Sequence, residues 1–263
     1  MAYTTIDDPE AYFKAVKYSS NGTAIGSGGL TVTGFDFQPD WLWMKQRDAD
    51  ESHGMYDSVR GVTKSLRSNG NDAEDTRTEG VTAFNSNGFT CGSDSRINPS
   101  GTHPMIAWGW KTGTAFSNDA SATGVGTLDS AGSINTTSGI SIQIVTAEAA
   151  TDTIAHGLSA VPTVFIIKKQ NAGDNWFCYF EKGVGNTSAL YLDTTDDAHS
   201  ANAGWWNNTS PTSSVITIST YTGAAPNLLI CFAEKQGFSK FGTYEGNGNA
   251  DGTFVYTGFK PAF

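Results

Sequence analysis

The chain has 263 residues, 38% hydrophobic and 12% aromatic, which is enough to bury one large core or two of moderate size. Its 30 glycines against 16% charged residues indicate many turns and few long helices, so the composition is that of an all-β protein. A formal net charge of −10 argues against a nucleic-acid partner, because binding phosphates needs clustered lysine and arginine.

The N-terminal stretch MAYTTIDDPEAYF has no basic region followed by an apolar core, so it lacks the pattern of a secretory signal. No run approaches the ~20 apolar residues that a membrane helix requires, so no membrane insertion is expected. After this arm, the apolar segments at residues 12–18 and 30–33 predict a first hairpin, joined by the glycine-rich NGTAIGSGG.

The next predicted strand organises the sequence, because it occurs twice. FQPDWLWMKQ at Phe37–Gln46 has a second version, VPTVFIIKKQ, at Val161–Gln170. Pro39 and Pro162 are 123 residues apart, and the lysines near the ends of the two motifs keep that spacing. Proline suits the first residue of a strand, and Trp, Phe, Ile and Val suit a half-buried pleated surface. Each copy is therefore predicted to be a central strand of one β unit.

Other landmarks favour an internal duplication. Gly34 and Gly157 are also 123 residues apart, and Trp108 in MIAWGWK corresponds to Ile230 in LLICFAEK with a spacing of 122. We expect tandem antiparallel β-sandwich domains, lectin-like or jelly-roll-like in character. The predicted organisation is an N-terminal arm at 1–11, a first sandwich at 12–113, a small-residue linker at 114–135, a second sandwich at 136–236, and the opening hairpin of an incomplete third repeat at 237–263.

The incomplete third repeat is predicted because a third version of the strand motif, FKPAF, begins at Phe259. A partial sandwich leaves unpaired strand edges and an exposed apolar face. The interpretation we favour is that the sequence is a fragment of a longer protein. The alternative is that this tail completes a sheet elsewhere.

Two shorter stretches carry local signals. Ser86-Asn87-Gly88 lies between two apolar alternations, and an Asn-Gly pair in that setting predicts a tight hairpin. The run TGTAFSNDASATGVGTLDSAGS has few apolar anchors, which predicts the linker named above.

No catalytic or metal-binding constellation stands out. The loop NGNADG at 247–252 resembles the start of an EF-hand, but Gly258 stands where a glutamate is required, so a hairpin loop is expected. The histidines and cysteines lack metal-ligand spacing, and the cysteines are expected to be reduced. A glycosidase needs two close carboxylates, and Asp57, Glu181 and Asp193 lie near strands without forming a pair in sequence. We therefore expect no enzyme, no cofactor and no metal, and we interpret the acidic clusters as solvated loop charge.

The aromatic residues are the most suggestive feature. Trp41 and Trp43 share one face of a strand, as do the two tryptophans of MIAWGWK, so these four are predicted to stack in a core. The adjacent pair at 205–206 faces opposite ways in a strand, which leaves one ring less buried. Beside the turn-rich NNTSPTSS, such a ring suits stacking on a sugar. The candidate ligand-binding residues are Trp205, Trp206, Asn207 and Asn208.

Four stretches carry a resemblance. They are MAYTTIDDPEAYF, GFDFQPDWLWMKQRDADESHGMYDSVRGVTKSL, SNGFTCGSD and CFAEKQGFSKFGTYEGNGNADGTFVYTGFKPAF. Together they resemble a family of uncharacterised tandem-repeat proteins of tailed bacteriophages, frequent in marine phages, and the resemblance spans essentially the whole chain. It implies a phage structural product of tandem β domains, among tail-fibre or other virion surface proteins. It defines no catalytic residues.

The expected function is that of a non-enzymatic surface protein of a phage particle. The leading hypothesis is a tail-fibre or appendage component that attaches to the host surface, with a glycan or receptor as partner. The alternatives are a protein that decorates and stabilises the capsid or tail, and a glycan depolymerase. Other virion proteins and further copies of the chain are the expected partners, and the expected location is the virion, after synthesis in the host cytoplasm. An attachment protein would expose aromatic residues on distal loops, whereas a decorating protein would bury an apolar patch against the particle.

Overall fold

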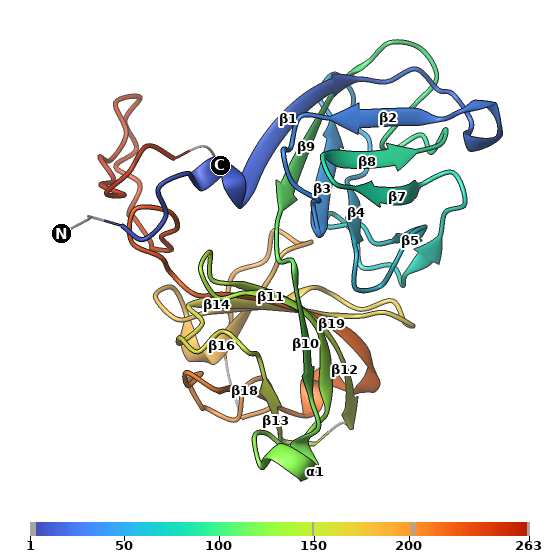
Figure 1. Ribbon diagram of the computed structural model, residues 1–263. Coiled ribbons are helices and arrows are strands. Elements are labelled where there is room, and N and C mark those ends of the chain that lie inside the picture. The colour runs from blue at the N-terminus through green and yellow to red at the C-terminus, as the bar shows by residue number, and fades with distance from the viewer. Residues whose placement is uncertain (1–3, 149, 201–202, 262–263) are drawn as a thin grey trace.

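The computed structural model describes residues 4–148, 150–200 and 203–261, and nearly all of its regular structure is antiparallel β-strand. Strands make up 40% of the chain and helices 5%, which confirms the prediction of an all-β sandwich fold. Two β bodies lie one above the other. The first residues of the chain lie beside its last part at one edge (Figure 1), where the rings of Tyr12 and Phe238 are 6.2 Å apart.

The first body contains two main sheets that face each other and a small two-stranded sheet. Its strands are β1 (Phe13–Ser19), β2 (Leu30–Thr33), β3 (Trp41–Gln46), β4 (Gly54–Asp57), β5 (Lys64–Ser65), β6 (Asp75–Thr76), β7 (Val81–Asn85), β8 (Gly88–Cys91) and β9 (Pro104–Trp110). The larger sheet has the order β1, β9, β3, β4, and the smaller sheet has the order β2, β8, β7. Side chains alternate along each strand, so Leu42 and Met44 of the larger sheet share a buried core with Val32 and Phe89 of the smaller one.

The second body is built around an eight-stranded sheet with the order β10, β11, β12, β19, β14, β15, β16, β17, next to the pair β13 and β18. Its core contains Phe165, Ile167, Ile216 and Leu229. The strands are β10 (Thr114–Asn118), β11 (Ser130–Asn135), β12 (Ile140–Glu148), β13 (Asp152–Ala155), β14 (Val164–Lys169), β15 (Phe177–Phe180), β16 (Gly185–Tyr191), β17 (His199–Ser200), β18 (Val215–Ile218) and β19 (Ala224–Phe232). Short helices complete the chain at η1 (Pro9–Ala11), η2 (Ile25–Ser27), α1 (Ala120–Thr123) and η3 (Thr220–Thr222).

Both bodies use one pairing scheme. The order β1, β9, β3, β4 of the first body has its counterpart in β12, β19, β14, β15 of the second, and the pair β2 and β8 has its counterpart in β13 and β18. Trp41 lies opposite Trp110 in the first body, and Val164 lies opposite Phe232 in the second. These are positions that the spacings of 123 and 122 residues predict to correspond. Matched registers favour the internal duplication, which stays a prediction.

A third core lies between the two bodies. Because side chains alternate along β3, Leu42 faces the core of the first body whereas Trp41 faces the second body. Trp41 and Met55 from the first body are buried together with Ile142, Trp176 and Ile230 from the second. The main sheet of each body is therefore apolar on both faces, and the bodies pack as one unit.

The tryptophans predicted to stack do so at this boundary. Trp41 is fully buried and stacks on Trp110 with 4.3 Å between ring centroids. Trp43 and Trp108 meet edge to face at 6.3 Å and, like Trp110, are half-buried. Of the four tryptophans predicted to stack in a core, only Trp41 is fully buried.

The segment predicted as a linker is instead part of a sheet. β10 pairs with β11, and β11 pairs with β12, so most of residues 114–135 belongs to the second body. Its small residues reflect close packing: a Cβ on Gly132 would lie 2.0 Å from the carbonyl oxygen of Ile142. Few apolar side chains are needed because β10 is the outermost strand and is largely exposed.

The first predicted hairpin is also wrong, because β1 pairs with β9 and β2 pairs with β8. Between β1 and β2 the chain crosses to the other sheet, through η2 and the left-handed glycines Gly28 and Gly29. The hairpin predicted around Asn87 is confirmed. β7 and β8 pair with Asn85 opposite Gly88, so Ser86 and Asn87 form the loop.

The segment predicted as a third opening hairpin contains no strand between Gly237 and Pro261, the part of it that the structure describes. None of the strands in the described part of the chain pairs with it. Ala262 and Phe263, which end the third motif, lie outside the described residues, as do Met1–Tyr3 of the predicted arm.

Candidate functional site

The predicted sugar platform is not on the surface. Trp206 is fully buried and Trp205 is 7% exposed, and both belong to the core of the second body. The Trp206 indole N–H donates to the carbonyl of Ser188 at 2.9 Å, and its ring meets Phe165 edge to face. The prediction fails because Trp205 and Trp206 lie in a turn. In a strand, adjacent side chains would face opposite ways, whereas here both rings point into the core.

Asn207 and Asn208 are exposed, as the prediction requires, but their geometry explains them without a ligand. Both adopt left-handed backbone conformations, with φ of 50° and 51°. Asparagine tolerates this region better than most residues, so the pair forms the turn that follows the buried tryptophans.

The three carboxylates considered for glycoside hydrolysis each have a structural partner. Asp57 is fully buried and bonds to Arg60 at 2.5 Å between Oδ2 and Nε. Asp193 accepts the backbone N–H of Trp176 at 2.9 Å, and Glu181 accepts the hydroxyl of Tyr179. These carboxylates hold loops and strands, and no observation supports catalysis by any of them.

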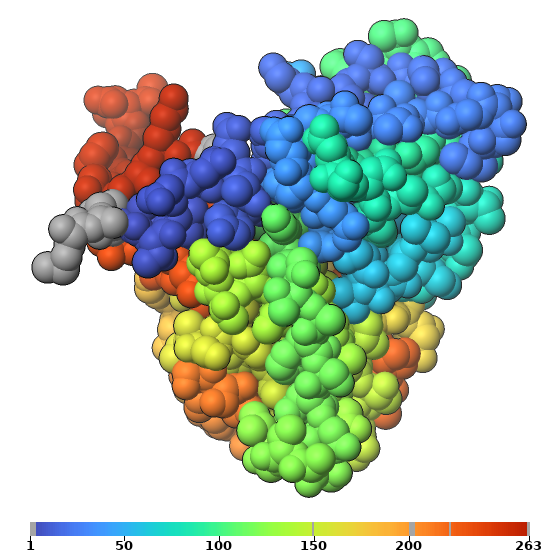
Figure 2. All heavy atoms as spheres, viewed as in Figure 1, coloured from blue at the N-terminus to red at the C-terminus, as the bar shows by residue number. Residues whose placement is uncertain are grey.

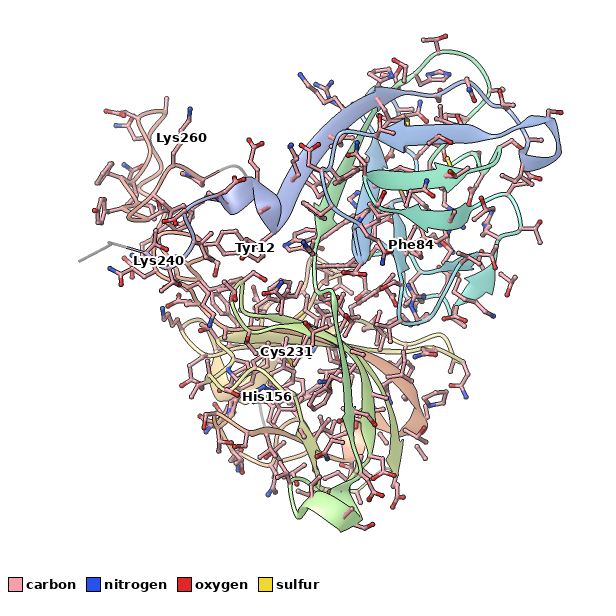
Figure 3. All side chains as sticks on the ribbon, in the orientation of Figure 1. Tyr12, Phe84, His156, Cys231, Lys240 and Lys260 are labelled. Carbon is pink, nitrogen blue, oxygen red and sulfur yellow. The ribbon has the colours of Figure 1, made fainter. Side chains whose placement is uncertain are left out.

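Metal-ligating side chains do not gather in the described part of the chain, where no group of three or more His, Cys, Asp or Glu side chains is placed to hold an ion. The loop at 247–252 closes on itself, because Asn247 Oδ1 accepts the N–H of Asn249 and its amide donates to the carbonyl of Asp251. His156 lies in the second body (Figure 3), where its Nδ1 accepts the N–H of Leu158 and burial lowers its pKa.

The lysine of the repeated strand motif has a structural role in both bodies. Lys45 Nζ donates to the carbonyls of Ala49 and Glu51 at 2.9 and 2.6 Å, which holds the loop after β3. Lys168 Nζ, in the corresponding place in β14, reaches the carbonyl of Ala172 at 3.5 Å. It also reaches the carbonyl of Asn71 in the first body at 3.2 Å, and burial lowers its pKa to about 8. The motif therefore conserves a loop clamp, and in the second body the clamp also joins the two bodies.

The three cysteines are buried and unpaired, and we predict that they resist modification in the folded protein. Burial raises the pKa of Cys91, Cys178 and Cys231 to about 12. At pH 8 the reactive thiolate should therefore be about a thousandfold scarcer than in the unfolded chain. Ellman's reagent should label no thiol in native protein and three in urea. Because the folded state keeps these protons, stability should also fall as the pH rises above ~8.5, where unfolded thiols ionise. Rapid native labelling of even one thiol would contradict the packing described.

A groove of about 610 Å³ runs along β10, β11 and β12 beside α1. Leu128 and Ile144 supply apolar surface, and the lining also includes Asp119, Asp129 and Glu148. None of the described residues that line it is a lysine or arginine. The groove is thus acidic at its rim and partly apolar inside.

The most exposed apolar surface lies in residues 240–261, called the C-terminal segment here. Tyr244, Phe254, Val255 and Tyr256 are 69%, 86%, 49% and 71% exposed, and only three other large apolar residues of the described chain exceed 36%. Figure 2 shows this segment projecting beside the N-terminal arm, away from the two bodies. Large exposed apolar side chains mark interaction surfaces, so this segment and the groove are the two candidate sites.

Sequence reasoning missed both sites for one reason. It read TAFSN at 114–118 as linker and TFVYT at 253–257 as half of a hairpin, so the first was not seen as a sheet edge and the second was not seen as unpaired. The available signal was the alternation of β-branched and aromatic residues in TFVYT, whereas TAFSN offers only Thr114 and Phe116 on one face.

No helix in the described part of the chain has the length and apolar character needed to cross a membrane. The search of curated proteins finds no match, and neither does the search of solved structures. A family model described as a domain of unknown function (DUF7483) matches residues 8–263. Since that match covers nearly the whole chain, the protein belongs to the DUF7483 family.

Proposed function

We propose that the chain is a non-enzymatic structural protein of a bacteriophage particle that binds other particle proteins through its C-terminal segment. The observation that carries this proposal is the exposure of Tyr244, Phe254, Val255 and Tyr256 within 13 residues. The N–H groups of Phe254, Val255 and Tyr256 have no main-chain partner in the described chain. A segment with exposed apolar side chains and unpaired N–H groups is suited to burial against a partner.

The phage setting rests on the resemblance of the four sequence stretches to tandem-repeat phage proteins. Two structural features support a structural role within it. The bodies share a continuous apolar core, and the candidate catalytic carboxylates are engaged in structural bonds.

Particle stabilisation is favoured over host attachment. The sugar platform that the attachment hypothesis placed at Trp205 and Trp206 is buried. The apolar surface that remains is the kind that a decorating protein would bury against a shell or tail.

Quantitative mass spectrometry of purified particles tests the proposal. The protein should co-purify with particles at a fixed ratio to the shell or tail proteins, through density-gradient and size-exclusion steps. A protein that is abundant in infected-cell lysate but absent from purified particles would contradict it.

A further inference from the structure

We infer that residues 253–260 of one copy bind a second copy by adding a strand to the β10 edge, with their side chains seated in the acidic groove. This inference rests on the proposed assembly role and names the partner as another molecule of the same chain. The main-chain bonds would supply affinity, and alternate side chains would supply specificity.

The donor run has the residue pattern of a strand, although it pairs with none of the described strands. In TFVYT, Phe254 and Tyr256 lie on one side of an extended chain and Val255 on the other. Gly258 follows the run with φ of 84°. The left-handed Gly34 and Gly157, with φ of 109° and 72°, come after β2 and β13, which are paired strands.

The donor run is also held in place by bonds to earlier residues of the segment. Lys240 Nζ donates to the carbonyl of Tyr256 at 3.0 Å and lies 5.9 Å from the centre of its ring. Thr253 Oγ1 donates to the carbonyl of Glu245 at 2.6 Å. These bonds leave the N–H groups of residues 254–256 without a partner in the described chain. Because the donor run is already held in place, pairing costs less conformational entropy.

The acceptor edge lacks the features that protect exposed strands. β10 ends the eight-stranded sheet and pairs with β11 alone among the described strands. Its sequence, TAFSN, contains no lysine and no proline, and its pairing has no bulge. By contrast, the outer strand β1 carries Lys14 and Lys17. Edges without such protection accept further strands.

The groove beside this edge complements the donor in charge and polarity. Asp119, Asp129 and Glu148 line it, whereas Lys240 and Lys260 lie on the segment (Figure 3). Residues 240–261 carry two lysines, one Asp and one Glu, so the segment is neutral on a chain of net charge −10. An approach through this segment therefore avoids most of the repulsion between two acidic copies.

The donor cannot reach the acceptor within one molecule. The C-terminal segment lies at the upper left of Figure 1, beyond the N-terminal arm, whereas β10 runs along the lower body towards α1. The contact is therefore heterologous, with the segment of one copy on the β10 edge of the next, and successive copies form a head-to-tail chain or a ring.

Sedimentation velocity of the full chain over a range of concentrations measures this association. Val255→Pro removes the N–H needed for pairing at an exposed position, so it should weaken association at least tenfold without unfolding the bodies. Val255→Thr keeps the N–H and β propensity and should associate like the natural chain. Ala115→Lys places a charge on the exposed face of β10 and should weaken association to the same extent. Circular dichroism checks each fold, and Ser117→Lys replaces Ala115→Lys if that variant is misfolded.

Mixing the two impaired variants tests the direction of the contact. The Val255→Pro chain keeps a natural β10 edge, and the Ala115→Lys chain keeps a natural segment, so an equimolar mixture should form a dimer that cannot grow. Association of Ala115→Lys alone at natural strength, or no dimer in the mixture, would overturn the inference. A natural chain that stays monomeric at roughly 100 μM would do the same. A monomeric chain that is nevertheless found in purified particles would leave the proposed function standing.

Discussion

Replacing Trp176 by alanine is expected to lower the free energy of unfolding by about 3–5 kcal/mol, which is the usual cost of removing a buried tryptophan side chain. Trp176 is fully buried between the two bodies. Although it comes from the second body, its indole N–H donates to the carbonyl of Arg67 in the first body at 2.8 Å. The substitution therefore leaves a cavity and an unpaired carbonyl at the shared core.

Urea unfolding followed by far-ultraviolet circular dichroism and by tryptophan fluorescence measures this loss. Because both bodies contribute to the shared core, the two signals should shift together in one transition. Trp176→Phe keeps most of the apolar volume and should cost much less. A fluorescence and dichroism record that splits into two transitions, with one of them unchanged from the natural protein, would show that the bodies unfold independently.

The second large effect is expected at the buried ion pair of the first body. Arg60 and Asp57 have side chains that are 1% and 0% exposed, and Asp57 also accepts the backbone N–H of Arg60 at 2.8 Å. Arg60 reaches Glu74 at 3.2 Å and the carbonyl of Met55 at 3.3 Å. Arg60→Met leaves Asp57 buried without its partner, so it should cost about 3–5 kcal/mol.

A double variant separates the cost of losing the ion pair from the cost of leaving one buried charge unpaired. Asp57→Leu with Arg60→Met removes both charges and should be less destabilising than the sum of the two single changes. Arg67→Met is the matched control, because Arg67 pairs with Asp72 at the surface and its loss should cost roughly 0–1 kcal/mol. A cost for Arg60→Met as small as that of the control would contradict the role given to the buried pair.

The sequence predicts the fold class because strand chemistry is local. The short apolar runs that follow Pro39 and Pro162 mark β3 and β14, and Gly88 marks the hairpin of β7 and β8. The strand partners are not local. β1 reaches β9, some 90 residues later, and nothing in the sequence of either strand specifies that choice.

The candidate site was harder to predict because exposure depends on the whole fold. In sequence, Trp205 and Trp206 look like an exposed aromatic pair that could bind a sugar. Only the packing of Phe165 and Phe177 around them shows that they are buried. Conversely, Phe254 belongs to a run that resembles a paired strand, yet it is 86% exposed because no strand lies beside it. Side-chain type alone does not distinguish these cases.

The repeated motif shows how a pattern and its physical cause can differ. The sequence shows that a lysine recurs near the end of each central strand, but it does not show what the lysine does. Lys45 and Lys168 each clamp the loop that follows their strand, and Lys168 also bonds to the first body. Such a role depends on carbonyl groups, which the sequence of side chains does not reveal.

We propose that this chain works as a structural protein that binds a neighbour through its C-terminal segment. Cryo-electron microscopy of intact particles tests it most directly, with attention to what contacts Phe254, Val255 and Tyr256. The account predicts density for both β bodies on the particle, with these side chains buried against a neighbouring protein. Particles in which the protein is present but residues 253–257 stay in solvent, while another face makes every contact, would contradict it.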